Sequence, residues 1–124
     1  MKINDSMIRS KKEIIQTYKE MKFKMGVFQI RNITSNKVFV EGSTDLSAIW
    51  NRHRFQLNNG SHPNVNLQKD WNDAGEQNFL FEIISVLMED ETITDHRKEV
   101  KKLEIMFLDE LQPYNDKGYN IKKG

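Results

Sequence analysis

One glutamate in this sequence stands where an apolar side chain would be expected. At roughly 100° per residue, Glu104 falls among Val100, Leu108 and Leu111, on the apolar stripe of a predicted C-terminal helix. Burying a carboxylate without a partner is costly or forces it to take up a proton. We therefore expect a cation, a hydrogen-bond donor or a metal ion beside Glu104. A structurally satisfied glutamate with no chemical role is the alternative.

A histidine occupies a comparable position in another predicted helix. His53 falls on the same side as Leu46 and Leu57, so its imidazole points inward among apolar side chains. An imidazole in such a place can act as a base or a ligand, although most inward histidines are simply hydrogen-bonded in a core. His62 lies in the turn before Pro63, where we expect it to be exposed and without function.

The rest of the sequence excludes several classes of site. No histidine pair has metal-binding helical spacing, no glycine-rich phosphate loop follows a strand, and no serine sits in a nucleophile elbow. The absence of cysteine removes disulfide scaffolds, thiolate zinc sites and cysteine nucleophiles. Any metal site must therefore use oxygen or imidazole ligands.

Length and composition indicate one domain with a single core. The chain has 124 residues, of which 37% are hydrophobic and 30% charged. No apolar run reaches the length of a membrane span and no secretory segment is visible, so we expect a cytoplasmic protein without membrane contact. The formal net charge is +1, but residues 1–70 carry 12 Lys/Arg against 6 Asp/Glu and residues 71–124 carry 7 against 12. This asymmetry permits DNA binding without requiring it.

The N-terminal third predicts a helix followed by a β-hairpin. Ser10-Lys11-Lys12-Glu13 has the pattern of a capping box, and a helix over residues 11–24 follows it. Two alternating segments, 26–32 and 37–43, then predict strands joined by a polar turn.

Two helices are predicted after the hairpin. The first begins at Thr44 or Asp45 and ends at Asn58-Asn59-Gly60, where glycine suits a left-handed cap. Pro63 is expected as the first residue of the next helix, which runs through Trp71, because its missing amide hydrogen costs nothing there.

The C-terminal part predicts a strand and a long helix. Residues 79–87 are almost continuously apolar, which is typical of a strand covered on both faces. Thr94 or Asp95 is expected to cap the last helix, which reaches Leu111.

Six segments, taken in order, resemble successive parts of the GIY-YIG nuclease domain. They are GVFQIRN, KVFVEGS, IWNRHRFQL, GSHPNVNLQKDWNDAGEQNFLFEII, LEIMFLDELQPY and GYN. The resemblance implies a GIY-YIG-like domain at residues 26–120, an N-terminal helical extension at 1–25 and a tail at 121–124. The implied fold class is α/β of the α+β kind, a three-stranded antiparallel sheet flanked by helices, with the N-terminal helix as an addition.

The resemblance also implies a chemistry. The family hydrolyses DNA phosphodiesters with a divalent metal, which implies Mg²⁺ or Mn²⁺ as cofactor and DNA as partner. Glu104 matches the metal-ligating glutamate, His53 a histidine of the active-site helix and Asn120 the asparagine that closes the motif. His62 matches a histidine found in some members. One carboxylate with waters and substrate oxygens is normal coordination for Mg²⁺.

Four positions of the family pattern are substituted. Phe28 and Phe39 stand where the family has tyrosines, so hydroxyl groups that could take or hold a proton are missing. Ile49 stands at the position of the active-site arginine, so a bidentate positive charge for phosphate oxygens is lost. Glu41 replaces the glycine after the second strand motif and adds negative charge.

These substitutions favour a GIY-YIG-fold protein with a degenerate active site, which binds DNA with little or no phosphodiester cleavage. One alternative is an active metal-dependent DNA endonuclease whose rebuilt site uses Glu41, His53, His62 and Glu104 around a divalent ion. The other is a non-catalytic protein-interaction module in which Glu104 and His53 pair in the core and the cleft is closed.

Overall fold

The computed structural model of the chain describes residues 24–122. Its elements, in chain order, are β1 (Met25–Asn32), β2 (Val38–Ser43), α2 (Leu46–Asn59), α3 (Val65–Ala74), the short 3₁₀ helix η1 (Glu76–Asn78), β3 (Phe79–Leu87), α4 (Arg97–Leu111) and the 3₁₀ helix η2 (Asn115–Lys117). The helix predicted over residues 11–24 lies outside the described residues, except for its last position. The predicted domain boundaries stay a prediction.

The three strands form one antiparallel sheet, as the resemblance implied, and their order is β2-β1-β3. The central strand is the most deeply placed, since Val27, Phe28 and Ile30 have no exposed surface. In the hairpin Phe28 pairs with Glu41 and Ile30 with Phe39. The register therefore places two of the substituted family positions, Phe28 on the central strand and Glu41 on β2, opposite each other.

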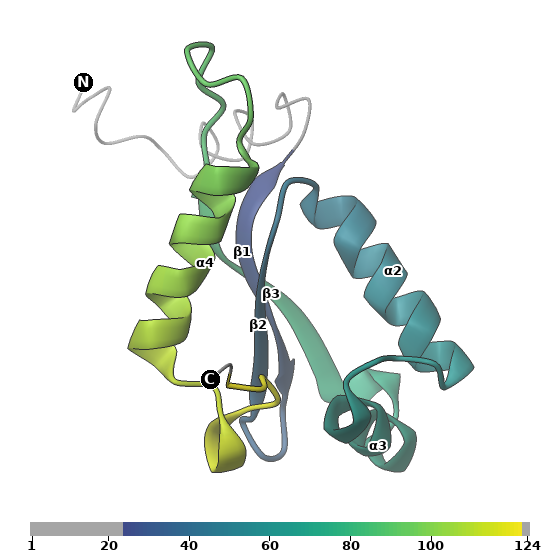
Figure 1. Cartoon of the computed structure of the whole chain (residues 1–124). Coiled ribbons are helices and arrows are strands. Elements are labelled where there is room, and N and C mark those ends of the chain that lie inside the picture. The colour runs from purple at the N-terminus through teal and green to yellow at the C-terminus, as the bar shows by residue number, and fades with distance from the viewer. Residues whose placement is uncertain (1–23, 123–124) are drawn as a thin grey trace, which may run out of the picture.

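Helices cover both faces of this sheet (Figure 1): α2 and α3 lie on one side and α4 on the other. The main core lies between the sheet and the α2–α3 pair. Its buried members are Phe28, Ile30, Leu46, Leu57, Leu67, Trp71, Phe79 and Tyr119. No helix within residues 24–122 is long and apolar enough to cross a membrane.

The ends of α2 are confirmed, but the start of α3 is not where it was predicted. Asp45 is the N-cap of α2 and accepts the amide hydrogen of Ala48, and Gly60 ends the helix with a φ of 75°. α3 begins two residues after Pro63, because the Asn64 side chain caps the helix by accepting the amide hydrogen of Leu67. A cap that makes this bond outweighs the preference of proline for the first turn.

The predictions for β3 and the start of α4 were partly wrong. β3 pairs only with β1 among the described strands, and Leu80 and Ile83 remain 40% and 39% exposed, so it is not covered on both faces. The N-cap of α4 is His96 rather than Thr94 or Asp95, and it makes no side-chain cap bond. Asp95 instead accepts the amide hydrogen of Arg97 from just outside the helix.

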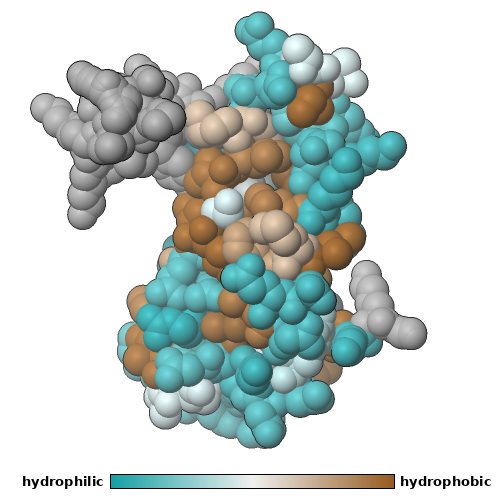
Figure 2. Space-filling model, turned by 90° about the vertical axis from the view of Figure 1, so that its left-hand side faces the viewer, coloured by the Kyte–Doolittle hydropathy of each residue, from teal (hydrophilic) through white to brown (hydrophobic). Residues whose placement is uncertain are grey.

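One side of α4 packs against the sheet, and the other side is exposed and partly apolar. Figure 2 views the molecule from the α4 side, where apolar residues gather between hydrophilic areas. Ile105 and Met106 of α4 are about half exposed, at 55% and 50%, whereas Val100 is buried against the sheet. Glu104 lies one turn beyond Val100, so it falls on the side of the helix that packs, as its spacing predicted.

The close approach of α4 to β2 depends on Gly42. A Cβ atom added there would lie 2.8 Å from Cγ1 of Val100 and 3.2 Å from Cβ of Glu104. We expect Gly42→Ala to lower the free energy of unfolding by about 1–3 kcal/mol, as overpacking typically does. Urea unfolding should detect this loss.

A double-mutant cycle with Val100→Ala provides the control. Because the smaller side chain removes the clashing methyl group, Gly42→Ala should cost less in that background than in the unchanged chain. Equal costs in both backgrounds would contradict the proposed contact.

Candidate functional site

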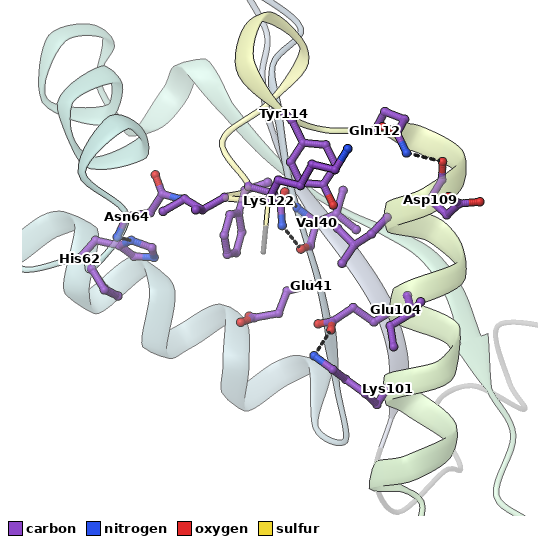
Figure 3. A pocket seen from close by; sticks show the side chains of 16 residues that line it. Val40, Glu41, His62, Asn64, Lys101, Glu104, Asp109, Gln112, Tyr114 and Lys122 are labelled. Carbon is purple, nitrogen blue, oxygen red and sulfur yellow. Dashed lines mark hydrogen bonds and ion pairs between the residues drawn. The ribbon is translucent and has the colours of Figure 1, made fainter. Parts of the chain in front are cut away.

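A groove of about 950 Å³ lies between β2, α4, the turn that holds His62 and the C-terminal segment (Figure 3). We call it the β2–α4 groove. It contains five of the eight residues singled out from the sequence: Phe39, Glu41, His62, Glu104 and Asn120. His53, Phe28 and Ile49 are not among its lining residues. Most of the residues singled out from the sequence therefore line one concave site.

Glu104 reaches the groove from α4 and has two partners. Its Oε2 accepts the amide hydrogen of Gly42 at 2.8 Å, and its Oε1 lies 2.7 Å from Nζ of Lys101. The side chain is 13% exposed. The expected cation and donor are both present, so that prediction is confirmed. The alternative in which Glu104 pairs with His53 is wrong, because neither partner of Glu104 is an imidazole.

His53 belongs to a different chain of hydrogen bonds. Nδ1 of His62 accepts the amide hydrogen of Asn64 at 3.0 Å. Nε2 of His62 lies 2.7 Å from Nδ1 of His53, and Nε2 of His53 lies 2.7 Å from Oε1 of Glu41. The chain therefore runs from a backbone amide through two stacked imidazoles to a carboxylate at the groove.

The backbone amide fixes the proton positions along this chain. An amide nitrogen can only donate, so Nδ1 of His62 has no proton and Nε2 carries it. That proton points at Nδ1 of His53, which must accept, so the proton of His53 is on Nε2 and is donated to Glu41. Both nitrogens of His53 are thus engaged inside the protein. No lone pair of this imidazole is directed at the groove.

The expectation that His62 would be exposed is wrong, since only 6% of its surface is accessible. The ring is held by the Asn64 amide and His53, and its own amide hydrogen is donated to Oε1 of Gln68. Burial, followed by the nearby His53, lowers the pKa of His62 to about 4. His62 is therefore neutral at physiological pH, as its place in the chain requires.

Asn120 is occupied by the outer edge of β2. Its Oδ1 accepts the amide hydrogen of Val40 at 2.8 Å, and its Nδ2 donates to the carbonyl oxygen of Val40 at the same distance. Just beside it, the amide of Tyr119 donates to the carbonyl of Val38. The Asn120 side chain therefore imitates one residue of a neighbouring strand.

Comparison with known proteins agrees with this architecture. The chain is 38% identical over 52 residues to intron-associated endonuclease 1 of Enterobacteria phage T4, which is 42% of this chain and 21% of that protein. The chain thus matches about a fifth of the length of this curated relative. No family model matches.

Two solved structures are similar over much more of the chain. The catalytic domain of homing endonuclease I-TevI has a TM-score of 0.67 and 29% identity, covering 81% of this chain and 100% of that one. A variant of that domain with one glutamate changed to alanine gives the same TM-score at 27% identity, over 82% and 97%. The resemblance to the GIY-YIG nuclease family is confirmed. The fold described above is that of the GIY-YIG catalytic domain.

The two phenyl rings predicted to replace family tyrosines lie beside the imidazoles. The Phe39 ring lies 5.5 Å from that of His53 and the Phe28 ring 5.7 Å, centroid to centroid. Phe28 is completely buried, and Ile49 packs on the main core. These three side chains place apolar surface where the resemblance predicts polar groups.

The grouping of Glu41, His53, His62 and Glu104 around one ion, which the active-endonuclease alternative described, is not present. No three histidine or acidic side chains within residues 24–122 are arranged to hold a metal. The physical reason is that His53 and His62 direct their nitrogens at each other, at Glu41 and at the Asn64 amide. Glu104 lies apart from this chain with its own partners.

Sequence reasoning missed three contributors to this GIY-YIG site. Lys101 precedes Glu104 by three residues, a spacing that brings side chains together on a helix, so it could have been found. The amide of Asn64 lies only two residues after His62, but a backbone group leaves no signal of its own in the sequence. The close approach at Gly42 leaves none either, because it depends on how distant segments meet.

The buried histidine pair makes stability depend on pH. The folded state holds the pKa of His62 near 4, whereas the ordinary value is 6.5. As pH falls from about 6.5 to 4, the unfolded chain takes up a proton that the folded chain excludes. About 3 kcal/mol of stability should therefore be present above pH 6.5 and be lost progressively toward pH 4. Urea unfolding at several pH values measures this.

The histidine responsible can be identified by substitution. His62→Gln should reduce the pH dependence of the unfolding free energy in that range. An equal slope in the unchanged chain and in His62→Gln would contradict the assignment.

Proposed function

We propose that this chain is a GIY-YIG domain that binds DNA and cleaves phosphodiesters little or not at all. The observation that carries the proposal is the engagement of both His53 nitrogens by His62 and Glu41. A general base must reach the proton it abstracts. The imidazole of His53 is 4% exposed and directs no lone pair at the β2–α4 groove.

The loss of a general base and of a positively charged donor is large enough to decide whether cleavage is detectable. A positioned general base typically contributes about 10²- to 10⁴-fold, and one electrostatic donor about 10²- to 10³-fold. Losing both would slow cleavage by roughly 10⁴- to 10⁷-fold, although losses within one step do not add fully. Even the smaller loss would leave no detectable cleavage in an ordinary nuclease assay.

Glu104 fits the role of a single-carboxylate ligand for Mg²⁺ or Mn²⁺. Its Oε1 already faces a cation at the groove, and a carboxylate oxygen is the donor that these ions prefer. When bound, such an ion supplies positive charge that polarises phosphate oxygens. The proposal therefore includes Glu104 as the metal ligand. It also includes the cytoplasmic location expected from the sequence.

The charges of the groove indicate when DNA can enter it. Its ionised lining residues are Glu41, Glu104 and Asp109 on the acidic side and Lys101 and Lys122 on the basic side. Three carboxylates against two ammonium groups leave a formal charge of −1, which repels phosphate. A divalent ion would reverse the sign. We therefore infer that DNA binding at this groove requires such an ion.

A second candidate function is an active metal-dependent endonuclease with a rebuilt site. The position of Glu41 favours it, because this carboxylate lines the same groove as Glu104, is 28% exposed and is oriented by His53. In this candidate Glu104 holds the ion, and Glu41, positioned by His53, lies close to it.

Binding and cleavage can be measured separately. With Ca²⁺ present, a fluorescent DNA duplex should bind with an affinity that falls as salt rises, because phosphate contacts release counterions. Chelating the ion should weaken binding.

Cleavage is followed as nicking of supercoiled plasmid in the presence of Mn²⁺. The unchanged chain should nick the plasmid no more than the Glu104→Gln variant does. Nicking by the unchanged chain that Glu104→Gln abolishes would favour the second candidate. In the binding assay, a DNA affinity that does not change with salt concentration would contradict contacts to phosphates.

Restoring the family groups tests whether the scaffold is otherwise competent. The combined variant Phe28→Tyr, Phe39→Tyr, Ile49→Arg and Glu41→Gly should gain metal-dependent cleavage, since it returns two hydroxyl groups and a guanidinium to the site and removes one negative charge. The same variant carrying Glu104→Gln is the control. If the combined variant is folded by circular dichroism and still does not cleave DNA, these substitutions are not what blocks catalysis.

A further inference from the structure

The ammonium group of Lys101 occupies the position beside Glu104 that a bound metal ion would take. Nζ of Lys101 lies 2.7 Å from Oε1 of Glu104, and both residues line the β2–α4 groove. The other oxygen of Glu104 is held by the Gly42 amide, which fixes the carboxylate in place. Lys101 is therefore the partner of the one oxygen that the backbone does not hold.

We propose that Lys101 is a tethered competitor for divalent ions at Glu104 and sets the affinity of the site. This inference rests on the proposed function in taking Glu104 as the metal ligand. A divalent ion and an ammonium group on the same oxygen repel each other strongly at such short range. The ion must therefore displace Lys101 before it can bind.

The exposure of the pair makes displacement feasible. The Lys101 side chain is 60% exposed, so its ammonium group can move into water, whereas Glu104 is 13% exposed and cannot follow. Ion pairs between neighbouring side chains of one helix are weak, so little is lost when the ammonium group leaves the carboxylate. The competition should thus lower the affinity for metal without abolishing binding.

Lys102 is a matched control on the same helix. It pairs with Glu99 at 3.6 Å, its side chain is 75% exposed, and it is not among the residues that line the groove. Replacing either lysine by methionine removes one positive charge and keeps an unbranched side chain with good helix propensity. Only the change at Lys101 removes a competitor from Glu104.

The test measures Mn²⁺ binding to the full chain without DNA. Broadening of the Gly42 amide signal in NMR spectra reports the site, because that amide contacts Glu104. Lys101→Met should bind Mn²⁺ about two- to fivefold more tightly than the unchanged chain, as expected from the strength of exposed ion pairs. Lys102→Met should leave the affinity unchanged, and Glu104→Gln should abolish the broadening at Gly42.

Each other outcome overturns the proposal. Equal affinity for Lys101→Met and the unchanged chain would show that Lys101 does not compete. Equal tightening by both lysine substitutions would indicate a general charge effect, and absence of broadening in every variant would show that Glu104 holds no ion. DNA binding and cleavage are measured in other assays, so the proposed function can fail or hold independently of this result.

Discussion

The outer edge of β2 is the constraint on which the site depends. An edge strand presents unpaired backbone groups, and a stable domain must satisfy or protect them. Here the carbonyl of Val38 accepts from the Tyr119 amide, both backbone groups of Val40 bond the Asn120 side chain, and the amide of Gly42 donates to Glu104. These contacts fasten the C-terminal segment and α4 to the hairpin, and the groove is the space that remains between them.

This arrangement changes how two of the site residues are interpreted. The resemblance predicts functional roles for Glu104 and Asn120, yet each also completes the hydrogen bonding of a strand. A chain that lost nuclease chemistry would still be destabilised by replacing them, because an unsatisfied backbone group costs about 1–3 kcal/mol. Their retention beside Phe28, Phe39 and Ile49 is therefore compatible with a site that no longer cleaves.

The sequence predicted the parts of the fold that local rules govern. The hairpin follows from alternation, the ends of α2 from Asp45 and Gly60, and the inward position of Glu104 from helical spacing. The burial of His62 could not be predicted in this way, because it depends on the ring of His53 and the side chain of Gln68, which α2 and α3 bring to the same turn. The edge position of β3 was missed for a similar reason, since an apolar run does not reveal how many neighbours a strand will have.

The hydrogen bond from the Asn64 amide has a consequence for proton movement. A peptide nitrogen cannot surrender its hydrogen at neutral pH, so the two imidazoles behind Glu41 form a dead end rather than a shuttle. If Glu41 took the proton of His53, and His53 that of His62, nothing could refill the last ring. The imidazoles can hold the carboxylate in place, but they cannot carry charge away from it.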